Sequence, residues 1–360
     1  TDKVQYMVSG GYNREEGMFK VNPDSFDKFN FRGKISVQPA KWINISDNAS
    51  YFSSKYNYPG QDNVEANFEH VVVHGLACFP THNPDGTNIH KLRKEVCTYT
   101  VFDDYHSMLW NENNHNLERK DQFSNTVEVT LTPVKQLEIK GNYTYTYYGS
   151  ATTHRWTEYQ YSEYPGNVVT STSPDWLSEK NSVTRYHAVN AYATYTDTFA
   201  DAHNLKVMLG YNYEQKHIKD VTAKGYNLIV ENLYDLNLVG GDADGIKQTE
   251  VKGGQNEYAI MGFFGRINYD YKGKYLLELA GRYDGTSRFA RNSRWGFFPS
   301  GSVGWKISEE DFFKPAKRTM NLLKLRYSYG QLGNQQVGYY DYIREVSIST
   351  QSYLFGGSKP

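Results

Sequence analysis

The strongest candidates for ligand binding are aromatic side chains in one polar segment, HRWTEYQYSEYPGNVVTSTSPDW, at residues 154–176. Its rings include Trp156, Tyr159, Tyr161 and Trp176, with few aliphatic neighbours. Flat aromatic faces can stack on sugar rings, so we expect this segment to contact a solute. The same rings could instead pack the segment onto itself or onto a partner protein, because aromatic residues anchor interfaces generally.

Other reactive residue types lack the spacing that known chemistry requires. The sequence has no G-x-S-x-G elbow, no H-E-x-x-H and no phosphate-binding glycine loop with lysine, so we expect no enzymatic activity. The histidines are irregularly spaced, and we expect neither a metal site nor a cofactor. Cys78 and Cys97 fall in one polar segment, where they could form a disulfide in an oxidising compartment or remain free thiols.

Composition narrows the class of protein. The chain holds 32 Tyr and 18 Phe but only 39% hydrophobic residues, and its net charge of -1 gives no reason to expect nucleic acid. No run approaches the roughly 20 apolar residues of a membrane helix. A mean hydropathy of -0.71 is nevertheless compatible with a membrane barrel, because every second residue of a barrel strand faces water.

The elements that carry these residues alternate with period two. In LEIKGNYTYTYYG, residues 137–149, Ile139, Tyr143 and Tyr145 share one face, while Lys140 and Thr144 share the other. A water-soluble sandwich would bury the apolar face, whereas a membrane barrel would expose it to lipid. Roughly a dozen such strands are expected, with a short helical turn near residues 308–321 that begins at a capping box of Ser308 and Asp311.

Charged side chains alternate with the apolar ones on several expected strands. By this alternation six of them point away from the aromatic face: Arg266, Glu278, Arg282, Lys306, Lys324 and Arg326. In a barrel they would face the lumen, as a polar wall that contacts a solute or as a solvated ladder of ion pairs.

Connections between the strands are uneven in length. Short turns are expected at residues 39–41, 132–136 and 272–274, while long polar segments span 57–117, 150–182 and 219–256. Most connections in compact domains run about 4–6 residues. A hairpin array places all short turns at one rim, and outer-membrane barrels have short periplasmic turns and long external loops. The sequence therefore favours an all-β, antiparallel, up-and-down transmembrane barrel.

Two motifs resemble one family. The segment RYDGTSRFARNSRWGFFPSGSVGWKISEEDFFK, followed by LLKLRYSYGQLGNQQVGYYDY, resembles the SusC/RagA-like TonB-dependent outer-membrane transporters. Upstream, YMVSGGYNREEGMFK and DKFNFRGKISVQPAKWINIS are similar to early barrel strands of the same family. The resemblance covers most of the chain.

Membership would imply a barrel of about 22 strands with an N-terminal plug, of which residues 1–360 would hold roughly half. We expect the plug domain, the TonB box and the C-terminal strands to be absent from this sequence. The implied function is import of oligosaccharides or peptides with a SusD-like lipoprotein lid and TonB-coupled energy. Two alternatives remain open, a secreted or surface glycan-binding module and a passive porin.

Overall fold

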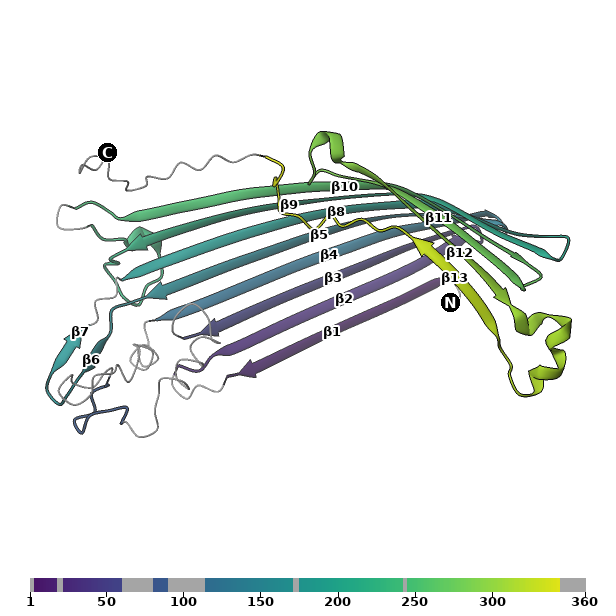
Figure 1. Ribbon diagram of the computed structural model, residues 1–360. Helices are drawn as coiled ribbons and strands as arrows, with labels where there is room; N and C mark the ends of the chain where they lie inside the picture. Colours follow the sequence, from purple (N-terminus) through teal and green to yellow (C-terminus); the bar gives the residue numbers. More distant parts are fainter. Residues whose placement is uncertain are drawn as a thin grey trace, which may run out of the picture. The chain divides into compact units, whose positions relative to one another are not determined.

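The computed structural model describes residues 3–17, 22–59, 80–89, 114–170, 175–241 and 245–343. Most of these residues belong to one antiparallel sheet of eleven strands, and a separate two-stranded sheet joins β6 to β7. Neighbours in the large sheet follow the order β1-β2-β3-β4-β5-β8-β9-β10-β11-β12-β13 (Figure 1). Each strand therefore pairs with the next long strand in the chain, which is the predicted up-and-down connectivity.

The strand bounds are, in chain order, β1 (Val4–Glu16), β2 (Ser25–Ala40), β3 (Ile43–Tyr58), β4 (His115–Val134), β5 (Leu137–Trp156), β6 (Gln160–Ser162), β7 (Val168–Thr170), β8 (Trp176–Phe199), β9 (His203–Tyr226), β10 (Thr249–Tyr271), β11 (Tyr275–Thr286), β12 (Trp295–Lys306) and β13 (Lys324–Gly330). Short 3-10 helices are η1 (Leu236–Leu238), η2 (Arg291–Ser293), η3 (Ile307–Glu309) and η4 (Asp311–Arg318). Among the described residues no helix is long or apolar enough to cross a membrane.

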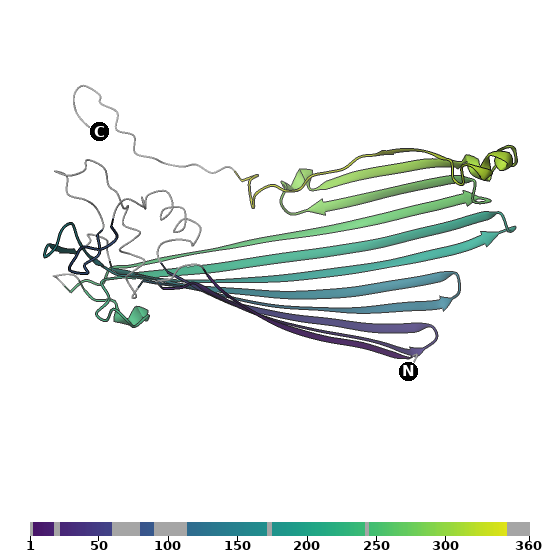
Figure 2. The same ribbon diagram turned by 90° about the horizontal axis from the view of Figure 1, so that it is seen from below.

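Tight turns reverse the chain at alternate strand ends (Figure 2). The connections predicted at 39–41, 132–136 and 272–274 are short, but the first two are confined to residues 41–42 and 135–136, because β2 and β4 extend further than expected. A further tight turn occupies residues 200–202, and the turn at 272–274 is as predicted. In the last of these turns, Lys272 has φ 52 and Gly273 has φ 66. Successive positive φ values characterise the type I′ turn, whose twist matches that of paired strands. The sequence Lys-Gly thus sets the register of β10 on β11.

The other strand ends carry the long connections at 59–114, 157–175 and 227–248. The last two are shorter than predicted, because β5, β8, β9 and β10 extend into segments that the sequence predicts as loops. Polar side chains do not prevent strand pairing there, since the ladder satisfies backbone N–H and C=O groups whatever the side chains are.

The connection between β12 and β13 contains the predicted helical turn but not the predicted cap. η3 and η4 are separated by Glu310, whose backbone is extended at φ -80 and ψ 149. Ser308 therefore lies inside η3, with its backbone N–H donating to the Leu323 carbonyl at 3.1 Å, and no side chain caps η4. The capping-box prediction for Ser308 and Asp311 is wrong, because the two residues do not begin one continuous helix.

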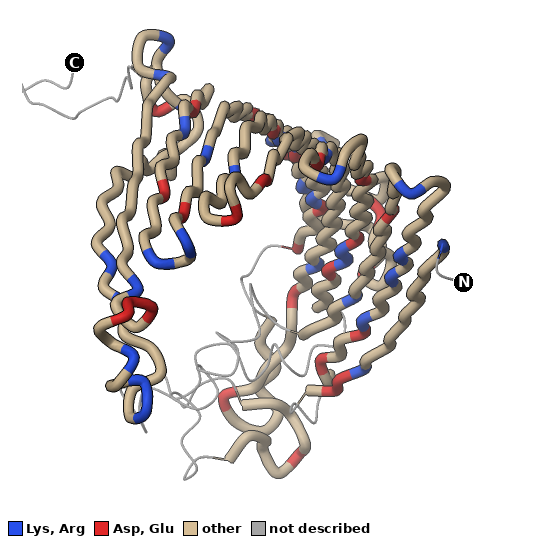
Figure 3. The backbone as a smooth tube through the Cα atoms, turned by 90° about the vertical axis from the view of Figure 1, so that its right-hand side faces the viewer, with Lys and Arg blue, Asp and Glu red and all other residues tan. Residues whose placement is uncertain are grey.

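Two units are distinguished by their internal contacts, and each is described by itself. The first comprises Thr1–Pro133, Lys140–Val189 and Lys216–Asn256; the second comprises Val134–Ile139, Asn190–Gln215 and Glu257–Pro360. In both units, acidic and basic residues are interleaved along the strands (Figure 3).

The apolar faces of the strands are open. Tyr143 of β5 is 45% exposed, and Val303 of β12 is 52% exposed. Within the described ranges, the only sheet besides the large one is the short pair β6 and β7. A sandwich would bury these side chains between two sheets of similar size, so the exposed faces favour the barrel over the sandwich.

Candidate functional site

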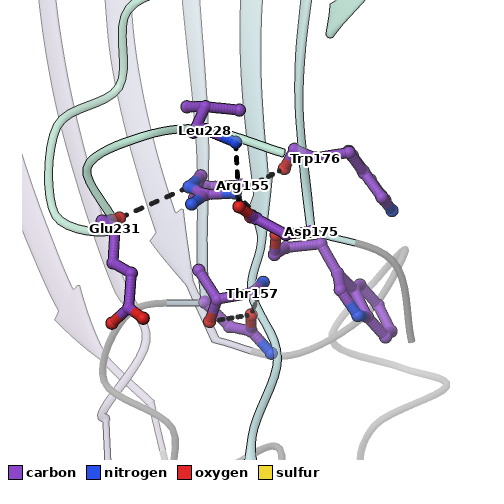
Figure 4. Close-up of polar contacts among 8 residues, drawn as sticks. Arg155, Thr157, Asp175, Trp176, Leu228 and Glu231 are labelled. Carbon is purple, nitrogen blue, oxygen red and sulfur yellow. Dashed lines mark hydrogen bonds and ion pairs between the residues drawn. The ribbon is translucent and has the colours of Figure 1, made fainter. Parts of the chain in front are cut away.

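The ends of the aromatic segment are held by a buried ion pair in the first unit (Figure 4). Arg155, the penultimate residue of β5, has a fully buried side chain, and its Nη1 contacts Asp175 Oδ1. The same Nη1 donates to the Trp176 carbonyl at 3.0 Å. The second carboxylate oxygen of Asp175 accepts from the Leu228 N–H at 3.0 Å. The pair therefore ties β5, β8 and the β9–β10 connection together.

Sequence reasoning missed this pair, although a signal was present. Arg155 directly precedes Trp156 and Asp175 directly precedes Trp176, so opposite charges stand beside a tryptophan at both ends of one segment. A buried charge is costly unless it is paired, so opposite charges at the two ends of a segment favour an ion pair that closes the base of the loop.

The two tryptophans stack on each other. The ring centroids of Trp156 and Trp176 are 5.9 Å apart, with 14° between the ring planes. Trp176 also meets the His154 ring edge-on at 4.8 Å, and the Lys224 Nζ lies 4.0 Å from its ring centroid. These neighbours cover part of the Trp176 ring, so less of its face is available to stack on a sugar than the sequence predicts.

The two tyrosines of the group lie in different surroundings. Tyr159 is only 5% exposed, while Tyr161 in β6 is half-buried, and their ring centroids are 6.3 Å apart. The turn at residues 80–89 packs beside them through the Asn88 carbonyl, which accepts from the Ser162 N–H at 2.7 Å. The four predicted rings thus form two pairs in contact, Trp156 with Trp176 and Tyr159 with Tyr161.

Asp85 fastens the same turn to the β6–β7 hairpin. One carboxylate oxygen accepts from the Thr87 hydroxyl at 2.6 Å, and the other accepts from the Gly166 N–H at 3.0 Å. The hydrogen bond from the Thr87 hydroxyl is the main reason that the pKa of Asp85 lies below its ordinary value. The long segments of the first unit therefore brace one another.

The six charged candidates share one face of the second unit. Cross-strand partners in an antiparallel pair lie on the same side of the sheet. The register places Glu278 opposite Ser302, Ser302 opposite Ser328, and Lys306 opposite Lys324. By the same alternation, that face carries Arg266, Glu278, Arg282, Lys306, Lys324 and Arg326.

Their partners do not form the expected ladder of ion pairs between strands. Glu278 accepts from the Asn268 amide at 2.8 Å, and Arg326 donates to the Ser302 hydroxyl at 3.2 Å. Arg282 pairs with Asp284 of its own strand at 2.8 Å. Most of these contacts join a charge to a neutral group, which leaves hydrogen-bonding capacity on the face.

Two cavities open on this face. The first, of about 400 Å³, includes Glu278, Lys324 and Arg326 in its lining. The second, of about 420 Å³, includes Arg282 and lies toward the end of β11 that leads into the β11–β12 connection. Four of the six predicted charged residues thus line one cavity or the other, while Arg266 and Lys306 line neither of these two.

Cys78 and Cys97 lie outside the described residues, so their disulfide stays a prediction. In the part of the chain that the structure describes, no group of His, Cys, Asp or Glu is arranged to hold a metal ion.

Comparison with known proteins adds sequence and structural relatives. The family described as TonB dependent receptor-like, beta-barrel matches residues 9–358. TonB-dependent receptor P26 of Formosa agariphila is 27% identical over 94% of this chain and 32% of its own length. TonB-dependent receptor SusC of Bacteroides thetaiotaomicron is 35% identical over 38% of this chain and 15% of its own length.

A solved structure of the RagAB peptide transporter covers 98% of this chain and 38% of its own, with a TM-score of 0.73 at 19% identity. At that identity the likeness concerns the fold alone. This chain spans less than two fifths of each of these proteins.

Proposed function

We propose that this chain, which belongs to the TonB-dependent receptor-like β-barrel family, forms wall strands of an outer-membrane transporter that imports a polar solute. The main support for this proposal is that the sheet has two different faces. Val303, Trp305 and Tyr327 lie on one face, and Ser302, Lys306 and Arg326 lie on the other. Such alternation suits a wall between lipid and a polar lumen.

The six charged residues are proposed to line that lumen: Arg266, Glu278, Arg282, Lys306, Lys324 and Arg326. Their mixed signs and neutral partners favour a polar wall that a hydrated solute can pass. Apolar residues on the opposite side would contact lipid, which agrees with the 52% exposure of Val303 and the 71% exposure of Tyr327.

The solute is proposed to be an oligosaccharide or a peptide. The resemblance to the SusC/RagA-like family implies such solutes, and one structural neighbour is named a peptide transporter. From the same resemblance we propose a SusD-like lipoprotein as the lid and TonB as the energy source. A plug and a TonB box would lie elsewhere in the full-length protein.

Of the predicted group Trp156, Tyr159, Tyr161 and Trp176, we propose solute contact for the open edges of Trp156 and Tyr161. The rings of Trp156 and Trp176 face each other, and Tyr159 is 5% exposed. Contacts within the long segments therefore cover most of the surface of these rings. Trp156 and Tyr161 retain partly open surface that a solute could touch.

Uptake by cells tests the proposal. Cells that carry the full-length receptor and cells that lack it are offered labelled oligosaccharides and peptides, with and without a protonophore. Receptor-dependent uptake that the protonophore abolishes is expected of energy-coupled import. Uptake that persists without a proton gradient would instead identify a passive pore, and equal uptake by both cell lines would refute transport.

A further inference from the structure

The second cavity is closed on one side by the segment that follows β13. Residues 331–343, here called the strap, contribute Asn334 and Gln335 to its lining. The strands contribute Asn212, Arg282, Asp284 and Phe298 from the charged face. The cavity of about 420 Å³ is therefore a built space on the proposed lumen side, large enough for one or two sugar rings.

The strap is fixed at its start. The Gln331 N–H donates to the Pro299 carbonyl at 3.0 Å. Gly333 lies so close to Phe298 that an added Cβ would collide with the ring. A glycine is required there because any side chain would push the strap away from the ring.

Arg288 fixes the strap further along. Its Nη1 donates to the Val337 carbonyl at 2.8 Å. Its guanidinium lies 4.3 Å from the ring centroid of Tyr258 in β10 and 5.0 Å from that of Tyr339 in the strap. Cation–π contacts on two rings together with a carbonyl hydrogen bond hold the strap in one position.

Polar groups in the cavity are oriented before any solute arrives. Arg282 contacts both carboxylate oxygens of Asp284, through Nε at 3.0 Å and Nη2 at 2.8 Å. Its Nη2 also donates to the Asn212 side-chain oxygen at 3.0 Å, and its guanidinium lies 5.2 Å from the Phe264 ring centroid. A bidentate pair of this kind is geometrically fixed. Arg282 remains about half exposed, so its outer edge is accessible.

The charges that line the cavity balance, with Arg282 and Arg294 against Glu214 and Asp284. The lining therefore has no net charge with which to attract a solute of either sign. Asn334 and Gln335 each offer an amide donor and an acceptor, which suits the neighbouring hydroxyls of a sugar, and Phe298 supplies an apolar ring. Arg282 and Asp284 are already paired with each other, so the charged termini of a free peptide would have to compete with that ion pair.

We propose that the cavity between the strap and the Arg282–Asp284 pair is a subsite for a neutral oligosaccharide. This inference rests on the proposed transport function and assigns its solute to one place on the wall. Arg282, Asp284 and Gln335 donate and accept hydrogen bonds to sugar hydroxyls, while the strap sets the width of the subsite.

Uptake and binding by the full-length receptor test the inference. The probes are neutral gluco-, manno-, xylo- and arabino-hexasaccharides, with unblocked pentapeptides for comparison. Receptor-dependent uptake first identifies which probe is imported, and calorimetry then measures its affinity for the purified receptor. Import of a hexasaccharide is expected. Import of peptides alone would overturn the neutral-sugar subsite while leaving transport intact, and import of no probe would refute both.

Three variants locate the subsite. Asp284→Asn and Gln335→Ala are each expected to weaken hexasaccharide affinity by about tenfold or more, through lost hydrogen bonds. Gly333→Ala is expected to weaken it by displacing the strap, with every polar group retained. Lys206→Gln is the matched control, because Lys206 lies on the same face of β9 as Asn212 but lines the other cavity. Unchanged affinity in all three variants, or an equal loss in the control, would overturn the assignment.

Discussion

The aromatic segment of the first unit and the strap cavity of the second both combine rings with charges, but they use them differently. Around Arg155, the guanidinium is fully buried and the neighbouring tryptophans stack on each other. Around Arg282, the guanidinium is about half exposed beside an open cavity. Aromatic content therefore does not identify a binding surface by itself. Our proposal for the subsite rests instead on accessible polar atoms that a fixed frame orients.

The largest expected effect is at Arg155. Arg155→Ala leaves the Asp175 carboxylate without its cation at a site where it is 16% exposed, and breaking a buried pair costs about 3–5 kcal/mol. We expect the free energy of opening of the ends of β5 and β8 to fall by that order. Hydrogen exchange of the backbone amides near residues 153–157 and 175–179, in the full-length receptor, measures it.

Lys180→Ala is the matched control for Arg155, because Lys180 is an exposed cation on β8. Its substitution is expected to leave exchange at those amides unchanged. Equal exchange rates in the Arg155→Ala variant and the wild type would show that the pair does not hold the loop base.

A smaller effect is expected from Trp176→Ala, which removes the stacked partner of Trp156 and the ring beneath Lys224. Such contacts contribute about 1–2 kcal/mol together, so the same amides should exchange faster but less so than in the Arg155 variant. Solute affinity should stay within about twofold of wild type in calorimetry, since the ring lies outside the proposed subsite. A tenfold loss of affinity would instead restore the aromatic segment as the binding surface.

Local sequence patterns predicted the fold better than the site, and the reason is physical. Period-two alternation fixes which face Ser302 and Val303 occupy, and Lys272-Gly273 marks its turn, because both depend on near neighbours in sequence. Arg155 with Asp175, or Arg288 with the strap, depends on contacts between distant segments. Alternation placed Arg282 on the charged face, yet nothing in its neighbourhood indicated the strap that completes the cavity.

The smallest effect concerns Glu310, which joins η4 to the strand ends of the second unit. Glu310 accepts from the Trp305 Nε1 at 3.1 Å and from the Lys274 Nζ at 3.0 Å. The Trp305 hydrogen bond is the main cause that lowers the pKa of Glu310 below its ordinary 4.5. A depressed pKa stabilises the folded state above pH 4.5, and that contribution is lost as the pH falls through the folded-state value.

Acidification below pH 4.5 should therefore loosen η4 before the strands separate. Hydrogen exchange of the Asp311–Arg318 amides, corrected for intrinsic pH dependence, is expected to show increased opening. Glu310→Gln should remove most of this pH dependence. Persistence of the same pH response in that variant would assign the effect to another group.

The central claim is that one face of this sheet meets lipid and the other meets water, and neighbouring residues on β12 test it most directly. Cysteines are placed singly at Ser302 and at Val303 in the full-length receptor with Cys78 and Cys97 replaced by serine, and the protein is reconstituted in bilayers. A membrane-impermeant maleimide should label Ser302→Cys and spare Val303→Cys, and a lipid-borne quencher should act on a fluorophore attached at 303 alone. Labelling of both positions, or quenching at 302 in place of 303, would contradict the barrel wall.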